Sequence, residues 1–210
     1  MIGVFGGTFD PIHLGHLRVA LEVKEQLHLT QMRFVPSRTP PHRVTPETGA
    51  VHRAAMVEVA IRGVPGFLLD RSELERDGPS YMIDTLTSLY AEVSDPLCLI
   101  LGYDAFAGLN HWHRWHALFD FAHVVVLNRA GTEGALPDEL ISWIKPRQTD
   151  SADALARVRQ GRVLLVNMLN FAVAASASQV RQLMAAGKDV RFLLTDPVIE
   201  YIRVHRLYRA

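Results

Sequence analysis

The stretch that decides the fold reads Gly6-Gly7-Thr8-Phe9-Asp10-Pro11-Ile12-His13-Leu14-Gly15-His16. An apolar run at residues 2–5 comes before it and predicts a first buried strand. Apolar residues follow it at the spacing of one helix face: Leu17, Ala20, Leu21, Val23 and Leu27. The predicted local order is therefore a strand, a tight glycine turn and the start of a helix.

A turn of this kind is suited to binding phosphate. The N–H groups at the start of a helix lack partners within the helix, and the helix dipole places partial positive charge there. We expect Asp10 to cap this helix and Pro11 to take its first position. His13 and His16 then project from the same side of the first turn, and Gly15 leaves the backbone open to a ligand.

Other interpretations of this stretch stay open when each part is taken alone. A glycine pair after a strand occurs in many tight turns. The two histidines could pair on a metal ion, although no third ligand follows at a recognisable spacing, or both could be core residues. The combination of Gly-Gly-Thr, Asp-Pro and His-x-Gly-His is far more specific than its parts, and it favours a phosphate site.

The composition is that of an ordinary globular protein. The 210 residues suffice for one domain, or for one domain with a small insertion, and for a sizeable core. Lys+Arg 22 balance Asp+Glu 22, so no overall field favours nucleic acid or an anionic membrane. We find no signal peptide and no apolar run long enough to span a bilayer. We therefore expect no nucleic-acid partner and no membrane partner.

The chain has a single cysteine, Cys98, inside the apolar run 97–101. We expect it to be a reduced core residue. One cysteine cannot form a disulfide within the chain, which fits a cytoplasmic protein. The sequence is compatible with a monomer or a homodimer.

Further short apolar runs predict the other strands. They lie at residues 32–35, 67–70, 96–101, 124–127 and 163–166. Helices are expected at 51–61, after residue 81, at 105–109, from residue 180 and at 197–207. Strands that alternate with helices are typical of a parallel sheet covered on both faces. The predicted fold class is therefore α/β: a Rossmann-like, doubly wound, mostly parallel sheet with helices on both faces.

Two common nucleotide-binding classes are excluded by their missing motifs. The chain has no Gly-x-Gly-x-x-Gly dinucleotide fingerprint and no Gly-x-x-x-x-Gly-Lys-Ser/Thr loop. Oxidoreductases of the first type and P-loop kinases are therefore excluded.

Candidate binding residues follow the strand at 96–101. Gly102 and Asp104 lie there, and open α/β sheets bind ligands at the carboxyl ends of their strands. Asp104 could accept hydrogen bonds from ribose hydroxyls, and it also suits the N-cap of the helix at 105–109. The run 110–116 is crowded with histidine and tryptophan. It favours an aromatic platform over a zinc site, because neither cysteine nor acid lies beside it.

The second half of the chain contains one segment without a clear apolar pattern and one further motif. Over residues 130–161 the apolar pattern weakens, so we expect a single domain over 1–210 with an insertion or mobile segment at 130–161. Ser176 or Ser178 is expected to cap the next helix, with Arg181 one turn in. The same pattern would also arise from an ordinary capped helix in which Arg181 is a surface residue without a role in binding.

Taken together, these motifs resemble those of the bacterial nicotinate-nucleotide adenylyltransferases, a family of the nucleotidyltransferase superfamily. The resemblance runs over residues 4–208. Besides the first stretch it includes Pro-Pro-His-Arg at 40–43, Pro-Ser-Tyr at 79–81, Gly-x-Asp at 102–104, a tryptophan at 112 and Ser-x-Ser-x-x-Arg at 176–181. The last motif departs from the usual one at Ala175 and Ser178, where isoleucine and threonine are usual.

The resemblance implies adenylyl transfer from ATP to nicotinate mononucleotide, giving deamido-NAD and pyrophosphate in NAD biosynthesis. Mg²⁺ would come with ATP, carried by phosphates and water, and no dedicated protein metal site is implied. The implied catalytic residues are His13, His16 and Arg181. The implied ATP-binding residues are Gly6, Gly7, Thr8, Phe9, Gly15, Gly102, Asp104, Ser176 and Ser178. The implied substrate-binding residues are His42, Arg43, Tyr81, Thr85, Trp112 and Arg129.

Rival functions remain open. One is a transferase of the same superfamily that uses nicotinamide mononucleotide or phosphopantetheine as the acceptor. Another is a nucleotide-binding module without turnover. A fragment of a class I aminoacyl-tRNA synthetase also carries His-x-Gly-His, but it needs a lysine-rich second motif, and residues 176–181 contain no lysine.

Overall fold

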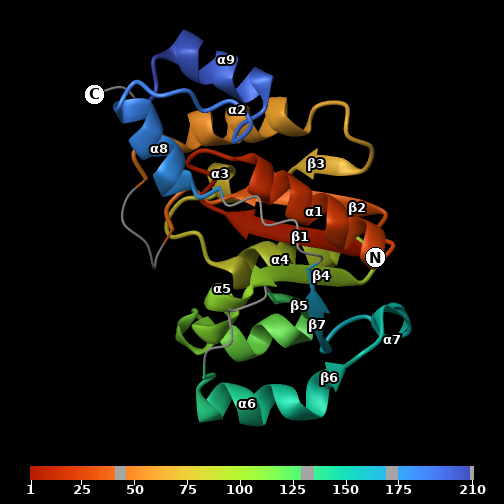
Figure 1. Cartoon of the computed structure of the whole chain (residues 1–210). Coiled ribbons are helices and arrows are strands. Elements are labelled where there is room, and N and C mark those ends of the chain that lie inside the picture. Colours follow the sequence, from red (N-terminus) through yellow and green to blue (C-terminus); the bar gives the residue numbers. More distant parts are fainter. Residues whose placement is uncertain (41–45, 129–134, 169–174, 209–210) are drawn as a thin grey trace. The chain divides into compact units, whose positions relative to one another are not determined.

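The computed structural model describes residues 1–40, 46–128, 135–168 and 175–208. Seven strands form one sheet in the order β3-β2-β1-β4-β5-β7-β6. Their bounds are β1 Ile2–Gly7, β2 Gln31–Pro36, β3 Phe67–Leu69, β4 Leu97–Gly102, β5 His123–Asn128, β6 Gln148–Thr149 and β7 Val163–Asn167. The strands run parallel. The expected Rossmann-like α/β fold is confirmed (Figure 1).

Helices connect the strands. The α-helices are α1 Leu14–Gln26, α2 Ala50–Ile61, α3 Ser72–Glu75, α4 Met82–Glu92, α5 Tyr103–Ala107, α6 Asp138–Ile144, α7 Ala152–Ala156, α8 Ala177–Ala185 and α9 Asp196–His205. The 3₁₀ helices are η1 Leu109–His111, η2 Trp115–Asp120 and η3 Lys145–Arg147. None of the helices in the described ranges is long and apolar enough to cross a membrane.

The chain divides into two compact units. The first unit consists of Met1–Gly6, Glu22–Met32 and Tyr81–Asn170. The second unit consists of Gly7–Leu21, Arg33–Ser80 and Phe171–Ala210. The single-domain organisation, with an insertion or mobile segment at 130–161, stays a prediction; the described part of that segment contains α6, η3, β6 and α7.

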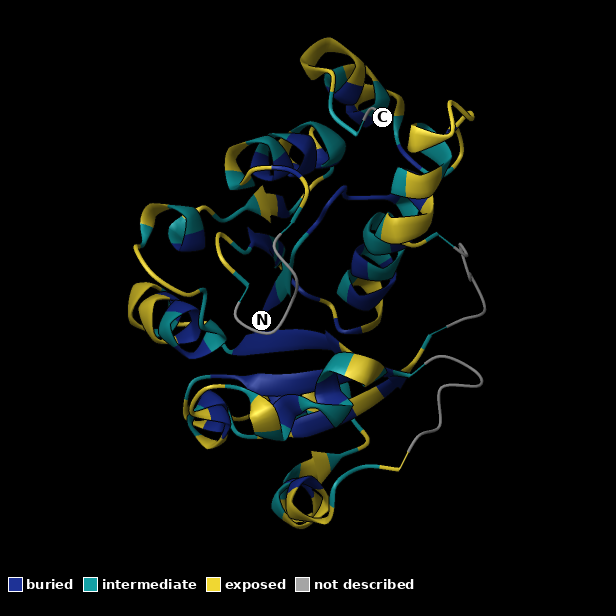
Figure 2. Cartoon of the chain, turned by 90° about the vertical axis from the view of Figure 1, so that its left-hand side faces the viewer, coloured by how far each residue is buried: buried dark blue, intermediate teal, exposed yellow. Residues whose placement is uncertain are grey.

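The first unit is built around β4, β5 and β7. Cys98 of β4 pairs with His123 of β5, and both are fully buried among aliphatic side chains. Figure 2 shows such buried residues in dark blue along the strands. The expectation of Cys98 as a free core cysteine is confirmed. The register also brings the carboxyl ends of the strands to one edge, because Gly102 pairs with Leu127.

The second unit packs α2 against α9, which lie side by side in Figure 1. Their buried faces carry apolar residues at helical spacing, among them Met56 and Val57 of α2 and Val198 and Ile202 of α9. The helix expected at 51–61 is confirmed.

Three expected helix boundaries were wrong. Helix α1 begins at Leu14, so Asp10 is not its cap and Pro11 is not its first residue. Helix α5 begins at Tyr103, which places Asp104 inside the first turn instead of at the N-cap. Helix α9 ends at His205, because the next residue adopts a left-handed backbone with φ of 54°.

Candidate active site

The glycine turn belongs to the second unit from Gly7 onward, and its geometry explains the glycines. Phe9 has a φ of 50°, a left-handed conformation that folds its ring back over the turn. A Cβ on Gly7 would lie 2.9 Å from that ring, and a Cβ on Gly15 would lie 3.0 Å from Nδ1 of His13. Only glycine leaves room for the two rings at these positions.

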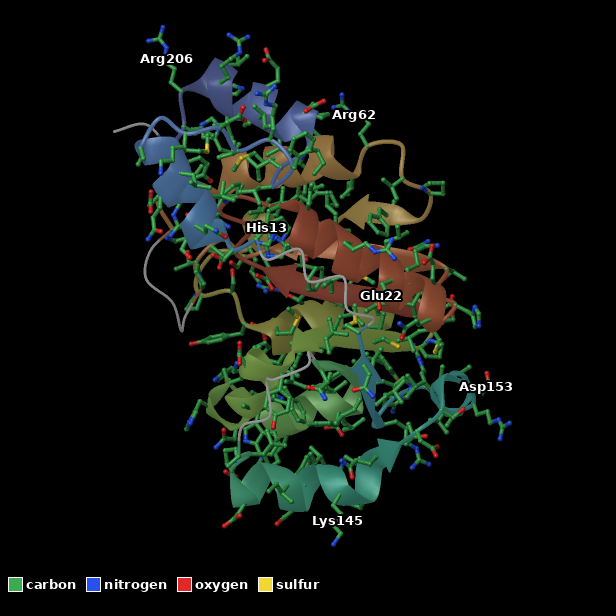
Figure 3. The ribbon with its side chains drawn as sticks, viewed as in Figure 1. His13, Glu22, Arg62, Lys145, Asp153 and Arg206 are labelled. Carbon is green, nitrogen blue, oxygen red and sulfur yellow. The ribbon has the colours of Figure 1, made fainter. Side chains whose placement is uncertain are left out.

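The two histidines form a stacked pair at the start of α1, where His13 directly precedes the helix and His16 lies in its first turn. Their ring centroids are 3.7 Å apart with an interplanar angle of 28°, and Phe9 contacts His16 edge-on. His13 is buried and His16 is half-buried. The expectation that both imidazoles lie on the same side of this turn is confirmed. Figure 3 labels His13 near the start of α1.

A backbone hydrogen bond selects the tautomer of His16. The N–H of His13 donates to Nδ1 of His16 at 3.3 Å. Because Nδ1 accepts, the neutral imidazole carries its proton on Nε2. The N–H donor of the His16 ring is therefore at Nε2, on the opposite side of the ring from the Nδ1 that bonds to the N–H of His13. The N–H of Leu14 donates to the carbonyl of Leu193 at 2.8 Å, so it is already used within the protein.

Asp10 anchors the turn to distant segments of the chain, and it is 4% exposed. Its Oδ2 accepts a hydrogen bond from the N–H of Glu47 at 2.9 Å. Its Oδ1 accepts one from the hydroxyl of Tyr208 at 2.5 Å. Its backbone carbonyl accepts one from Nη1 of Arg181 at 2.8 Å. The carboxylate is thus committed to two other segments, which explains why it does not cap α1.

Arg181 reaches the glycine turn from helix α8. Its Nη1 bonds to Asp10, and its Nε donates to Oε1 of Glu47 at 2.6 Å. The Arg181 side chain is 26% exposed and that of Glu47 is 60% exposed. Arg181 lies one turn into α8 as expected, but it is not an isolated surface arginine. The structure brings the last sequence motif directly onto the first.

Ser176 is the N-cap of α8. Its Oγ accepts a hydrogen bond from the N–H of Gln179 at 3.2 Å. The hydroxyls of Ser176 and Ser178 lie 3.2 Å apart, and both residues are exposed. Of the two serines that the sequence left open as caps, the structure selects Ser176.

A buried arginine fixes the same turn from helix α2. Arg53 is 1% exposed and donates to four backbone carbonyls, those of Thr8, Ser37, Thr48 and Arg38, at 2.5, 2.6, 2.9 and 3.3 Å. Burial lowers the pKa of Arg53, and the negative charge of Asp10 opposes that effect. Arg53 therefore ties the glycine turn to the end of β2 and to the start of α2.

The first unit carries the residues expected around adenosine. Gly6, which was expected in the phosphate-binding turn, is the last residue of β1 that belongs to this unit, and a Cβ there would lie 2.5 Å from Cε of Met82. Gly102 and Asp104 are exposed, at the carboxyl end of β4 and in the first turn of α5. Both lie at the sheet edge where such folds bind ligands.

The first unit also carries the expected acceptor residues. Tyr81, the N-cap of α4, stacks on His113 with ring centroids 4.3 Å apart. Trp112 follows η1 and is half-buried. Thr85 is fully buried, and its N–H donates to the carbonyl of Tyr81 at 3.4 Å. The helix-start N–H groups that lack partners inside α4 are therefore those of Met82 and the residue after it.

Three expected site residues, His42, Arg43 and Arg129, lie outside the described residues. Within the described ranges, no group of three or more His, Cys, Asp or Glu side chains is placed to hold a metal ion. The roles assigned to individual site residues stay predictions.

Sequence reasoning missed Arg53, Glu47 and Tyr208. Arg53 did leave a signal, because it precedes Met56 and Val57 by three and four residues on the apolar side of α2. A charge on that side needs buried acceptors. Glu47 and Tyr208 left none, since their partner is a residue far away in the sequence.

Comparison with known proteins places the chain in a family. The family model described as cytidylyltransferase-like matches residues 4–183. The probable nicotinate-nucleotide adenylyltransferase of Pseudomonas putida is 49% identical over 211 residues, covering 100% of this chain and 90% of that protein. The one of Pseudomonas aeruginosa is 47% identical, covering 100% and 97%.

Solved structures share the fold. A Plasmodium falciparum nicotinic acid mononucleotide adenylyltransferase complexed with NaAD has a TM-score of 0.72 at 18% identity, covering 99% of this chain and 96% of that one. A putative nicotinate-nucleotide adenylyltransferase from Vibrio parahaemolyticus has a TM-score of 0.61 at 15% identity, covering 99% and 94%. The chain belongs to the cytidylyltransferase-like family and, within it, to the nicotinate-nucleotide adenylyltransferases.

Proposed function

We propose that this chain transfers the adenylyl group of ATP to nicotinate mononucleotide, giving deamido-NAD and pyrophosphate in NAD biosynthesis. One observation carries the proposal. A ring N–H of His16 and the guanidinium of Arg181 come from opposite ends of the sequence, and Arg181 reaches the turn that carries His16 by donating to the carbonyl of Asp10. Two such donors beside one glycine turn suit a substrate with several phosphates.

The reaction is a substitution at the α-phosphorus of ATP. A phosphate oxygen of nicotinate mononucleotide forms a new P–O bond, and the bond to the oxygen that bridges the α- and β-phosphorus breaks. The electron pair of that bond leaves with pyrophosphate. Such transfer needs little covalent work from the protein, so positioning and charge stabilisation supply most of the rate.

Each part of the second-unit site has a task in this scheme. His16 donates from Nε2 to phosphate oxygens as charge moves onto the bridging oxygen, and His13 supports it by stacking. The turn at Gly7, Thr8 and Phe9 holds the phosphates with backbone N–H groups. Arg181 binds the departing pyrophosphate.

The ion pair between Glu47 and Arg181 has to break before Arg181 can bind a phosphate of ATP. Its carboxylate holds Nε of Arg181 at 2.6 Å, where a phosphate oxygen of ATP would bind. The Glu47 side chain is 60% exposed, so the ion pair is screened by water and exchanges at small cost. Bound ATP therefore replaces one anion on Arg181 by another.

Mg²⁺ enters with ATP as part of the substrate. Mg²⁺ keeps several waters and is bound largely through phosphates in sites of this kind. The carboxylate of Asp10, a residue of the turn that is 4% exposed, already accepts two hydrogen bonds and is not set up as a cage ligand. When bound, the ion neutralises phosphate charge and orients the leaving group.

In the first unit, Gly102 and Asp104 border the adenosine, and Trp112 offers a ring face to the pyridinium of the acceptor. The N–H groups at the start of α4, beside Tyr81, favour the carboxylate of nicotinate over the neutral amide. A hydrogen bond to a charged group contributes about 1.5–3 kcal/mol. That range corresponds to a preference on the order of tenfold to a hundredfold.

The test is pyrophosphate release with Mg-ATP and three acceptors in turn: nicotinate mononucleotide, nicotinamide mononucleotide and phosphopantetheine. We expect the fastest release with the first. Equal rates with the acid and the amide would contradict the specificity and leave the enzyme class intact. Release only with phosphopantetheine, or with none of the three, would overturn the function. The cytoplasmic location and the choice between monomer and homodimer stay predictions.

A further inference from the structure

Tyr208 contacts the glycine turn through Asp10. It lies after helix α9, and its hydroxyl donates to Oδ1 of Asp10 at 2.5 Å although the two residues are 198 positions apart in the sequence. Its φ is 55°, in the left-handed region that residues with a Cβ rarely adopt. Phe9, directly before Asp10, has a φ of 50°. Uncommon backbone conformations of this kind concentrate at functional sites.

The contact connects Tyr208 to Arg181 through a single intermediate. Asp10 accepts from Tyr208 with one carboxylate oxygen and from the N–H of Glu47 with the other. The carbonyl of the same residue accepts from Arg181, and Glu47 pairs with that arginine as well. Among the described residues, the Arg181 guanidinium thus bonds to Asp10 and to Glu47, whose N–H Asp10 holds, and the bond to the Asp10 carbonyl is the one that remains when ATP replaces the Glu47 carboxylate.

The Tyr208 hydroxyl stays protonated, so it always acts as the hydrogen-bond donor to Asp10. Burial, and next the hydrogen bond to Asp10, raise the pKa of Tyr208 above its ordinary value. The hydroxyl thus keeps its proton at neutral pH and can donate a hydrogen bond to Asp10. A carboxylate that accepts from a neutral hydroxyl and from an N–H has both oxygens fixed, and it cannot swing toward solvent without losing a bond.

We propose that Tyr208 is a positioning residue for adenylyl transfer, which acts through Asp10 to fix the guanidinium of Arg181. The inference rests on the proposed function. Without the hydroxyl, one oxygen of Asp10 loses its partner, and the turn and its carbonyl gain freedom relative to Arg181. Misplacing a donor at a reacting phosphate lowers the rate of the chemical step more than it weakens substrate binding.

The test compares Tyr208→Phe with the matched control Tyr201→Phe. Tyr201 lies on α9, and its hydroxyl contacts Nδ1 of His52 at 3.0 Å, not Asp10. Both variants lose one hydroxyl and keep the ring. We expect Tyr208→Phe to lower kcat about tenfold, as loss of one bond to a charged group would, with little change in KM for ATP. Tyr201→Phe should remain within about twofold of the unmodified chain.

A double variant separates positioning from general loosening of the fold. In an Arg181→Ala background, Tyr208→Phe should change kcat by less than about twofold, because the group that it positions is gone. A similar tenfold fall in both backgrounds would overturn the proposal, as would a Tyr208→Phe variant that behaves like Tyr201→Phe. A chain that makes no deamido-NAD even when unmodified would overturn the proposed function and this inference together.

Asp10→Asn provides a second route if Tyr208→Phe does not fold. It keeps the backbone carbonyl that Arg181 uses, but its amide can no longer accept from both Tyr208 and the N–H of Glu47. We expect kcat to fall about tenfold in the otherwise unmodified chain and by less than about twofold in the Arg181→Ala background. Equal falls in the two backgrounds would contradict the proposed route through Arg181.

Discussion

Replacing Arg53 by methionine is expected to destabilise the protein strongly. The side chain is 1% exposed, and its guanidinium donates to the carbonyls of Thr8, Ser37 and Thr48 within 2.9 Å. Methionine fills much of the same space but donates nothing. The three carbonyls would remain close to an apolar side chain and would lose their partner.

The magnitude follows from these contacts. Three bonds from a charged donor at about 1.5 kcal/mol each, the low end for such bonds, give roughly 4.5 kcal/mol. The desolvation that lowers the pKa of Arg53 offsets part of this. We therefore expect the free energy of unfolding to fall by about 3–4 kcal/mol.

Urea denaturation followed by circular dichroism measures this change. Arg62→Met is the matched control, because Arg62 sits at the end of the same helix and points into solvent (Figure 3). The control should change the free energy of unfolding by less than about 0.5 kcal/mol. A loss below about 1 kcal/mol for Arg53→Met would refute the reasoning, since the buried bonds would then add almost nothing to the net stability.

Four further predictions concern two substitutions, the pH dependence of stability and the reactivity of the cysteine. His16→Ala should lower kcat by about 10²–10³ with unchanged circular dichroism, because a preorganised donor is lost. Glu47→Gln should lower the KM for ATP up to about fivefold, because the anion that competes for Arg181 loses its charge. Burial lowers the pKa of His123, so the unfolded chain takes up a proton first and the free energy of unfolding should fall as the pH drops below about 6.5. Burial raises the pKa of Cys98 to about 12, so a thiol reagent should react with it only after unfolding.

Each of these has a contradicting result. A near-normal kcat for His16→Ala, with His28→Asn as an exposed control, would make His16 a core residue. An unchanged or raised KM for Glu47→Gln would mean that this carboxylate does not compete with ATP. Urea midpoints that do not shift between neutral and mildly acidic solution would contradict the argument for His123. Rapid labelling of native protein would contradict that for Cys98.

Much of the fold could be predicted from the sequence, because strands buried on both faces form continuous apolar runs. The run around Cys98 is of this kind, and its strand and burial followed from the residues alone. Ends of helices were less predictable. Asp10 has the chemistry of an N-cap, but partners from distant segments bind both of its carboxylate oxygens.

The candidate site was predictable where a motif is local and not where the contact is long-range. The stacking of His13 and His16 follows from their spacing on one turn. The bond between Arg181 and Asp10 joins the two ends of the sequence, and no periodicity within either segment indicates it. Tyr208 had no signal for the same reason, since its partner is set by the tertiary fold.

The most direct test of the central claim follows the fate of each phosphate of ATP. The unmodified chain is incubated with nicotinate mononucleotide and Mg-ATP labelled in separate reactions at the α- or the γ-phosphorus. We predict that the α-label appears in deamido-NAD and that the γ-label appears only in pyrophosphate. A γ-label transferred to the acceptor, or an α-label released as free AMP without a dinucleotide, would contradict adenylyl transfer by this site.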